Sequence, residues 1–367
     1  TPQSYAKPSK VASTLSAIKT YHINAPSLDN KKLEEAAING VINALNDPYS
    51  HYLSKDRVIK MKESRSSKQV GIGVQLGIRG KKLSVITTFP NSPAALAGLK
   101  PLDHIVSING EDTKTLSINE AMQRLIGKKE SKVRLEIRRS TAFKPLQFAI
   151  ERNEYHIQSI EETVVFYDAI GYMKFVSFNK DNAAIEFKQN LEALLQENIK
   201  GLIIDVRNNG GGLLKHADSI ISYFIKEGPM YQIVNKENQK QVKYTNGDAF
   251  CTEIPLFILV NEGTGSSAEL LASALKENKR ASIIGTKTFG KASIQKLFSF
   301  NDGSALILTI SKFKSASGKD IDSVGVPIDI EKEIPKETLQ IMNDPHYIYT
   351  LENDYQLQEA VDHALIT

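Results

Sequence analysis

A serine and two lysines in the second half of the chain are the side chains best suited to covalent chemistry. Ser266 follows the turn residues Asn261, Gly263 and Gly265 and opens an apolar stretch with helical spacing. A serine at the first turn of a helix commonly caps backbone N–H groups, which is one interpretation of Ser266. The other is a nucleophile, because free N–H groups at a helix start can stabilise an oxyanion beside it. The local pattern leaves both interpretations open.

The segment of residues 285–295 could supply a phosphate site or a general base. It nearly matches the pattern of Gly, four residues and Gly-Lys-Ser/Thr that binds nucleotide phosphates, but Ala292 replaces the hydroxyl that would bind magnesium. A nucleotide site is therefore the weaker interpretation. A serine nucleophile needs a general base, and a lysine can act as one only when burial lowers its pKa. Lys287 and Lys291 are both candidates, and each could instead be a solvated surface charge.

Histidine, cysteine and metal chemistry find little support in the residue pattern. Cys251 is the only cysteine, which excludes an internal disulfide and a cysteine-rich zinc site. The seven histidines contain no His-Glu-x-x-His pair. His216 follows a Gly-rich turn and could act as the base for Ser266, although a lone histidine is more often structural or exposed. We expect neither a metal nor another cofactor.

Two motifs in this region resemble those of the carboxyl-terminal processing proteases, the tail-specific serine peptidases of family S41. They read Asn261-x-Gly-Thr-Gly-Ser266-Ser-Ala-Glu269 and Lys287-Thr-Phe-Gly290-Lys291-Ala-Ser-Ile-Gln295. The spacing of 25 residues from Ser266 to Lys291, and of four from Lys291 to Gln295, agrees with the family. The likeness extends to residues 46–50, 204–212 and 302–306, so that it covers most of the chain.

The resemblance implies a role for each matching residue. Ser266 would be the nucleophile, Lys291 the general base, and Gln295 the residue that holds the lysine amine by a hydrogen bond. The N–H groups of Ser267 and Gly211 would bind the oxyanion. The activity implied is that of a serine endopeptidase that cleaves proteins near their C-termini.

The middle of the chain, about residues 68–152, resembles a PDZ domain. The likeness rests on Ser92-Pro-Ala-Ala95, Ala97-Gly-Leu-Lys-Pro101 and Asp103-His-Ile-Val-Ser-Ile-Asn-Gly110. In that family the N–H groups of a glycine-containing loop bind the terminal carboxylate of a peptide that adds to the sheet edge. The matching loop here is Gly71-Ile72-Gly73-Val74. The resemblance implies that this module binds substrate C-termini and tethers the substrate or gates the catalytic pair.

Departures from the family motifs keep a second hypothesis open. Ala292 replaces a Gly, and Gly265 and Ser267 replace alanines. Some family members carry an Asp eleven residues after the nucleophile, where this chain has Glu277. We expect Glu277 to be an ordinary charge on a solvent-facing helix. The alternative to an active protease is a PDZ peptide-binding scaffold on a catalytically degenerate core.

The elements that must position these residues follow from hydrophobic periodicity. A helix is predicted ahead of Asn46-Asp-Pro48, which ends it. The Lys- and Ser-rich residues 60–68 are predicted to be a linker or a mobile surface stretch. Short β-rich runs at 71–76, 83–88, 104–108, 133–138 and 146–150 surround one helix at about 117–125. Strands at 170–176, 201–206 and 256–260 then alternate with helices at 182–197, 213–225 and 266–279, which is an α/β pattern.

These elements predict an α/β (α+β) chain in four parts. They are an N-terminal helical segment (1–66), the PDZ domain (67–152), a protease core (153–340) and a C-terminal helical tail (341–367). For the core, the resemblance implies a crotonase-like ββα superhelix. The helical N- and C-terminal segments of the chain suggest a homo-oligomer. We also expect a regulatory or adaptor protein as a partner.

Charge and hydropathy exclude several classes of partner. Lys and Arg number 46 against 42 Asp and Glu, so bulk charge does not favour nucleic-acid binding. No stretch approaches the roughly 20 apolar residues that span a bilayer. Because the chain begins without Met, we expect that a signal or anchor has been removed. The resemblance implies a bacterial cell-envelope location, periplasmic or otherwise extracytoplasmic.

Overall fold

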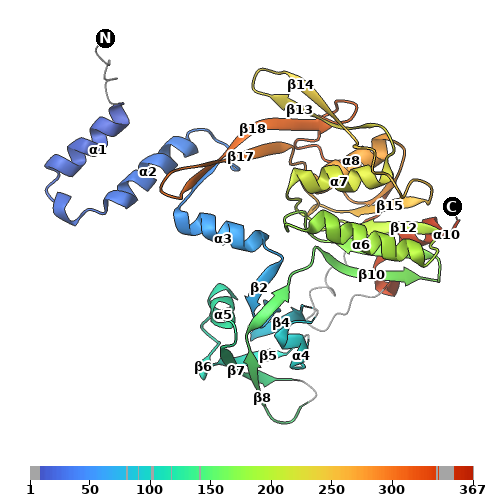
Figure 1. The fold of residues 1–367 in the computed structure, drawn as a ribbon, viewed down its shortest axis with the longest axis horizontal. Coiled ribbons are helices and arrows are strands. Elements are labelled where there is room, and N and C mark those ends of the chain that lie inside the picture. Colours follow the sequence, from blue (N-terminus) through green and yellow to red (C-terminus); the bar gives the residue numbers. More distant parts are fainter. Residues whose placement is uncertain are drawn as a thin grey trace. The chain divides into compact units, whose positions relative to one another are not determined.

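A computed structural model describes residues 9–79, 82–89, 91–100, 103–116, 118–139, 142–335, 338 and 351–366. The chain divides into two compact units. The first contains the described residues up to Lys62 together with Val234–Lys240 and Ser293–Lys312. The second contains the rest (Figure 1).

The first unit combines helices with an antiparallel sheet. Asp29 accepts hydrogen bonds from the N–H groups of Lys31 and Lys32 and so caps the second helix. Strand β18 pairs with β1 on one side and β17 on the other. Leu53, Val58 and Ala305 form a small buried cluster with this sheet. The elements are α1 (Lys10–Tyr21), η1 (Ala25–Ser27), α2 (Asn30–Asn43), β1 (His51–Leu53), α3 (Lys55–Arg65), β17 (Ser293–Ser299) and β18 (Ala305–Ser315).

Helix α3 corrects one expectation. The run 60–68, predicted to be a linker or a mobile surface stretch, is helical as far as Arg65. The run is rich in Lys and Ser because α3 is exposed over most of its surface. Val58, which precedes the run, is the buried residue of this helix.

The PDZ-like module contains the predicted β-rich runs and the predicted helix. Five strands form a sheet in the order β3-β4-β5-β7-β8, β6 pairs with β5, and β2 pairs with β9. The apolar core includes Val85, Ile105, Leu125 and Ile137. The elements are β2 (Lys68–Gly71), β3 (Val74–Arg79), β4 (Lys82–Thr88), α4 (Pro93–Leu96), β5 (His104–Ile108), β6 (Glu111–Asp112), α5 (Ile118–Leu125), β7 (Lys132–Arg138), β8 (Leu146–Glu151) and β9 (Asn153–His156). Pro101, Ser117, and residues 341–350 and 367 of the predicted tail lie outside the described residues.

A second six-stranded sheet has the order β10-β11-β12-β15-β16-β19 and is parallel from β11 onward. Both faces are covered, which explains the continuous apolar runs in its central strands. The elements of this part of the chain are β10 (Ile160–Phe166), β11 (Ile170–Phe175), α6 (Ala183–Gln196), β12 (Gly201–Asp205), α7 (Leu214–Phe224), β15 (Leu256–Val260), α8 (Ser267–Glu277), β16 (Ser282–Gly285), β19 (Ile330–Glu331), η2 (Leu351–Asn353) and α10 (Tyr355–Ile366). Strands β13 (Pro229–Asn235) and β14 (Lys240–Tyr244) do not belong to this sheet.

Helix α10 packs on one face of this sheet, against β11, β12, β15 and β16 (Figure 1). Helices α6, α7 and α8 lie next to one another in sequence order. The predicted α/β class is confirmed, whereas the four domain boundaries stay a prediction. The loops that carry the predicted site follow β12, β15 and β16, so they share the carboxyl edge of the parallel strands, where ligands bind in open α/β sheets.

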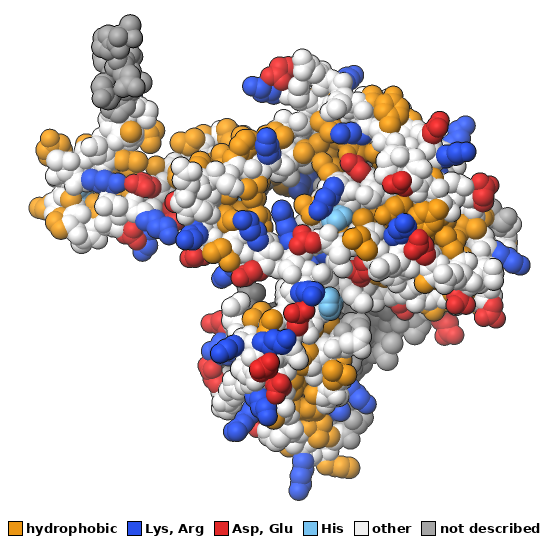
Figure 2. All heavy atoms as spheres, viewed as in Figure 1, with side chains coloured by type: hydrophobic (Ala, Val, Ile, Leu, Met, Phe, Trp, Pro, Cys, Tyr) orange, Lys and Arg blue, Asp and Glu red, His pale blue; other side chains and the backbone are white. Residues whose placement is uncertain are grey.

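The molecular surface agrees with the nearly balanced composition. On the face in Figure 2, basic and acidic side chains are interspersed. Among the helices that the structure describes, none is both long and apolar enough to cross a bilayer.

Candidate active site

Ser266 lies at the junction between the β15 turn and helix α8. It is the N-cap residue of α8, and its carbonyl oxygen accepts a hydrogen bond from the Leu270 N–H at 3.0 Å. Its φ of 55° and ψ of −118° differ from the extended conformation that N-cap serines usually adopt. A non-glycine residue with such a φ costs roughly 1–3 kcal/mol and is typical of functional sites. The side chain is half-buried and so retains access to solvent.

The turn that carries Ser266 is fixed by hydrogen bonds within itself and to the neighbouring loop. The Thr264 hydroxyl accepts from the Asn261 N–H at 3.0 Å and donates to the Val206 carbonyl at 2.8 Å. The Gly265 N–H donates to the Asn209 carbonyl at 3.0 Å. The nucleophile candidate is therefore attached to the loop that contains the predicted oxyanion residue.

A buried carboxylate, Glu269, joins the serine loop to the lysine loop. Its Oε2 accepts hydrogen bonds from the N–H groups of Ser266 and Lys291, each at 2.9 Å. Its Oε1 accepts from the Thr288 hydroxyl at 2.7 Å and from the Gly290 N–H at 2.6 Å. The Glu269 side chain is completely buried, so these donors replace the water that would otherwise solvate its charge.

The shared oxygen sets how far apart the two loops can be. Because hydrogen bonds to one acceptor are about 3 Å long, the backbone nitrogens of Ser266 and Lys291 lie within about 6 Å of each other. The Lys291 side chain is half-buried, whereas Lys287 is exposed. Of the two lysine candidates, Lys291 is the one that this carboxylate holds beside Ser266.

Gly211 lies against Ser266, as its predicted oxyanion role requires, but its N–H already donates a hydrogen bond to another residue. A Cβ placed on Gly211 would lie 2.9 Å from the Ser266 Cβ and 2.7 Å from the Ser267 nitrogen. Its φ of 89° also favours glycine. The Gly211 N–H donates to Asn209 Oδ1 at 2.9 Å, and the Ser267 N–H belongs to the first helical turn, where no intrahelical acceptor exists.

Gln295, the third predicted catalytic residue, belongs to the other compact unit. It lies on β17, where its Nε2 donates to the Ser293 hydroxyl at 2.9 Å and the Thr309 hydroxyl at 3.2 Å. These bonds hold the amide within the β17–β18 ladder. Its predicted role beside Lys291 stays a prediction.

His216 and Glu277 have environments that the sequence pattern did not specify. His216 is buried on α7, where burial lowers its pKa, and its Nε2 has no hydrogen-bond partner among the described residues.

Glu277 accepts hydrogen bonds from the Ser315 hydroxyl and from both the N–H and the hydroxyl of Ser317. The expectation that Glu277 is an ordinary solvent-facing charge is therefore wrong, because the side chain holds the turn that follows β18.

The predicted carboxylate loop connects β2 and β3. The side chains of Ile72 and Val74 are buried in the core of the PDZ-like module, and Gly73 has a φ of 74°. The Gly73 carbonyl accepts from the Ser92 hydroxyl at 2.9 Å, which fixes the loop to the start of α4. A Cβ on Gly71 would lie 3.3 Å from the Leu125 carbonyl oxygen, so the loop reaches the end of α5.

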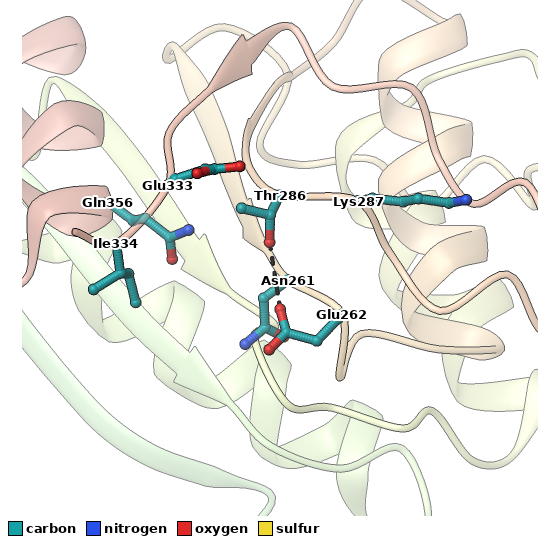
Figure 3. Close-up of a pocket in the computed structure, with 7 residues that line it drawn as sticks. All are labelled: Asn261, Glu262, Thr286, Lys287, Glu333, Ile334 and Gln356. Carbon is teal, nitrogen blue, oxygen red and sulfur yellow. Dashed lines mark hydrogen bonds between the residues drawn. The ribbon is translucent and has the colours of Figure 1, made fainter. Parts of the chain in front are cut away.

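A pocket of about 310 Å³, lined mostly by polar residues, lies at the roots of the loops that carry Ser266 and Lys291 (Figure 3). The Thr286 hydroxyl donates to Glu262 across it at 3.4 Å. Lys287 extends away from the other lining side chains in this view. The lining residues are Asn261, Glu262, Thr286, Lys287, Glu333, Ile334 and Gln356.

Sequence reasoning missed Glu269 and Asn209 as functional residues. Glu269 occurs three residues after Ser266, which is the spacing of a capping box and could have indicated its bond to the serine N–H. Its bonds to Thr288, Gly290 and Lys291 had no local signal, because they join segments about 20 residues apart.

Comparisons with known proteins agree with this arrangement. The family model of Peptidase family S41 matches residues 169–332, a PDZ domain model matches residues 90–139, and the model of the Activating protease CtpB N-terminal domain matches residues 2–57. The chain is 35% identical over 302 residues to the carboxy-terminal processing protease CtpB of Bacillus subtilis (strain 168), covering 82% of this chain and 62% of that relative. This chain therefore spans less than two thirds of that protein.

Two further proteins match over more of their length. The carboxyl-terminal-processing protease of Synechocystis sp. (strain ATCC 27184 / PCC 6803 / Kazusa) is 32% identical over 343 residues, covering 91% of this chain and 78% of the relative. The solved structure of a photosystem II D1 C-terminal processing protease is 25% identical and has a TM-score of 0.54, covering 94% of this chain and 95% of that one.

Replacing the shared carboxylate tests its structural role. Glu269→Gln keeps the shape of the side chain but gives it an NH₂ group that faces N–H donors. We expect the free energy of unfolding to fall by about 3 kcal/mol, measured by urea denaturation. Glu262→Gln, an exposed position on the same turn, serves as the matched control. Equal stability of the two variants would contradict the assignment.

The turn held by Glu277 predicts a pH-dependent stability difference. Burial raises the pKa of Glu277, but the hydrogen bonds from Ser317 and Ser315 outweigh it and leave the pKa below the ordinary value of 4.5. A carboxyl with a lowered folded-state pKa stabilises the protein above its unfolded pKa and loses this contribution as pH falls. The melting temperature of the wild type should exceed that of Glu277→Gln by a few °C at about pH 7. A gap of the same size near pH 3 would be inconsistent with this role.

Proposed function

The chain belongs to peptidase family S41, and from this premise we propose that it is a serine endopeptidase that cleaves proteins near their C-termini, with Ser266 as nucleophile and Lys291 as general base. The relatives named above are carboxy-terminal processing proteases. Their names support the position of the cut, and the loops of this chain support the residues proposed to make it.

The observation that carries the proposal is the single oxygen of Glu269 that binds the N–H groups of both Ser266 and Lys291. A nucleophile and its base must lie within hydrogen-bond reach of one another in the reacting complex. A buried carboxylate that fixes the two backbones at one point limits the space that the two side chains must bridge. The positive φ of Ser266 also supports its role as nucleophile, because a sharp strand-to-helix turn exposes a nucleophile to its substrate.

The proposed reaction proceeds through an acyl-enzyme. The Ser266 Oγ attacks the scissile carbonyl carbon while Lys291 Nζ takes the hydroxyl proton. The tetrahedral intermediate then collapses, the C–N bond breaks, and the Lys291 ammonium gives the proton to the leaving amine. Water activated by the same lysine hydrolyses the ester and releases the second product. In this scheme Gln295 holds the lysine amine.

The oxyanion would be bound by the N–H groups of Ser267 and Gly211. The Ser267 N–H is available at the start of α8, whereas the Gly211 N–H must exchange Asn209 Oδ1 for the substrate oxygen. A short rotation of the Gly211 peptide would release this donor, because glycine tolerates a wide range of backbone conformations. The state described here is then a resting state in which Asn209 occupies one oxyanion donor.

We further propose that the loop Gly71-Ile72-Gly73-Val74 binds the terminal carboxylate of the substrate and that this binding tethers the substrate or gates the catalytic pair. The support is the position of the loop at the end of α5 and the fixing of its carbonyls by the β4–α4 segment, through the Ala94 N–H and the Ser92 hydroxyl. Carbonyls held in this way leave N–H groups as the polar groups that a carboxylate can use.

The location and assembly of the protein are part of the same proposal. We place it outside the cytoplasmic membrane of a bacterium, where processing proteases of this kind meet exported substrates. A regulatory protein or a second copy of the chain would be its protein partner. Cell fractionation with an antibody against this chain tests the location.

The catalytic assignment is tested with three single variants and an unstructured protein such as casein. Ser266→Ala and Lys291→Ala should each reduce the cleavage rate by at least about a thousandfold, because each removes a group that takes part in the proton transfer. Lys287→Ala, which removes an exposed lysine from the same loop, should cleave at the wild-type rate. Cleavage by either catalytic variant at the wild-type rate would overturn the assignment. A wild type that binds substrate without cutting it would favour the scaffold hypothesis.

The PDZ proposal predicts that peptide binding depends on the terminal charge. The Ser266→Ala variant is titrated with a fluorescent peptide that has an apolar, free C-terminus and with the same peptide as its C-terminal amide. The free acid should bind at least about tenfold more tightly, because charge-assisted hydrogen bonds to N–H groups are lost in the amide. Equal dissociation constants would argue against a carboxylate site.

A further inference from the structure

A buried ion-pair cluster joins the C-terminal segment to the strand that precedes the oxyanion loop. The Arg207 guanidinium lies between two carboxylates, with its NH2 nitrogen 2.6 Å from Asp205 Oδ2 and 2.6 Å from Asp354 Oδ2. Its NH1 nitrogen donates to Asp354 Oδ1 at 2.8 Å. The side chains are 11%, 1% and 6% exposed for Arg207, Asp205 and Asp354, so the cluster is shielded from solvent.

Neighbouring polar groups complete the cluster. The Tyr172 hydroxyl donates to Asp205 Oδ2 at 2.9 Å, and the Gln356 amide oxygen accepts from Arg207 at 3.1 Å. Burial opposes the charge of Arg207, yet Asp205 and Asp354 more than offset this effect and raise its pKa. A buried charge of this kind depends on each of its partners, since removing one leaves the others uncompensated.

Arg207 lies directly at the start of the loop that carries Gly211. Its own N–H donates to Asp205 Oδ1 at 2.9 Å, so the turn out of β12 and the guanidinium share one carboxylate. Two residues further on, the Asn209 carbonyl accepts from the Gly265 N–H, and its side chain holds the Gly211 N–H. The position of Arg207 therefore sets where the oxyanion loop begins.

Asp354 belongs to a part of the chain 147 residues away from Arg207. It precedes helix α10, and its Oδ1 also accepts from the Leu357 N–H at 3.1 Å. Gln356 donates to the Lys332 carbonyl at 2.7 Å and lines the pocket at the root of the serine loop, opposite Thr286 (Figure 3). The start of α10 thus contacts the roots of the loops that carry the proposed chemistry.

Helix α10 also packs on the sheet through an apolar face. Its apolar face, Leu357, Ala360, Val361 and Ala364, packs with Ile170, Tyr172, Ile203, Phe257, Leu259 and Ile284. Burial of such a face is the dominant favourable term in helix docking. The hydrogen bonds from Arg207 to Asp354 are therefore an interaction additional to this apolar packing.

We propose that Asp354 is a positioning residue for the reaction. Through Arg207 it fixes the position of the oxyanion loop relative to Ser266, so that catalysis depends on the segment at the start of the C-terminal helix. The inference rests on the proposed function of Ser266 and Lys291. Asp354 touches neither the substrate nor the reacting atoms, and its effect is transmitted by the backbone from Arg207 to Gly211.

The test compares Asp354→Asn with Asp362→Asn, an exposed aspartate on the same helix, in the full chain. Steady-state cleavage of a fluorogenic peptide is measured per folded molecule, with the folded fraction taken from circular dichroism. For Asp354→Asn we expect kcat to fall on the order of tenfold to a hundredfold, with KM within about twofold of the wild type. Asp362→Asn should match the wild type in both constants. Asp354→Glu, which keeps the charge, should recover part of the lost kcat.

Other outcomes separate the two claims. A wild type that does not cleave the peptide would remove the proposed function itself. A cleaving wild type with Asp354→Asn at the same kcat would overturn the positioning role. A loss that disappears when rates are corrected for the folded fraction, or that appears only in KM, would also overturn it. If Asp354→Asn does not fold, the kcat of Asp354→Glu decides, because a positioning role requires the longer side chain to lower kcat without altering KM.

Discussion

One buried carboxylate organises the candidate site. Glu269 has no exposed surface, so its charge must be compensated within the protein, and the four donors that compensate it come from two different loops. This requirement couples folding to function: the lysine loop cannot move away from the serine turn without leaving a buried charge short of partners. The strained backbone of Ser266 is held by the same interaction, because its own N–H is one of the four donors.

The parallel sheet explains why separate segments meet at this carboxylate. Strands β12, β15 and β16 are neighbours, and the loops after them carry Gly211, Ser266 and Lys291 in turn. Helix α10 adds a fourth segment from the opposite face, where Asp354 pairs with Arg207. Two buried charged side chains therefore hold these loops. Glu269 binds the loop after β16, and Arg207, at the start of the loop after β12, binds Asp354.

The sequence predicted the elements with strong periodicity and the residues with strong local signals. Residues 256–260 form a strand as expected, and the helix predicted from Ser266 begins one residue later. The run 71–76 was predicted as one strand, but Gly73 adopts a left-handed conformation and divides it into β2 and β3. The less apolar strands β10, β14 and β17 carried no clear alternation. The hydrogen bonds of Glu269 to the lysine loop and of Asp354 to Arg207 could not be predicted from the sequence, because they depend on how distant segments pack.

Glu269 binds the backbones of Ser266 and Lys291, and we propose that it thereby holds the proposed nucleophile beside its proposed base. The most direct measurement is the rate at which a fluorophosphonate labels Ser266, read by mass spectrometry of the peptide that contains it. At matched folded fractions, Glu269→Gln should be labelled about a hundredfold more slowly than the wild type, because a small displacement of the proposed nucleophile Ser266 from the proposed base Lys291 would be costly. Labelling of both proteins at the same rate would contradict the claim.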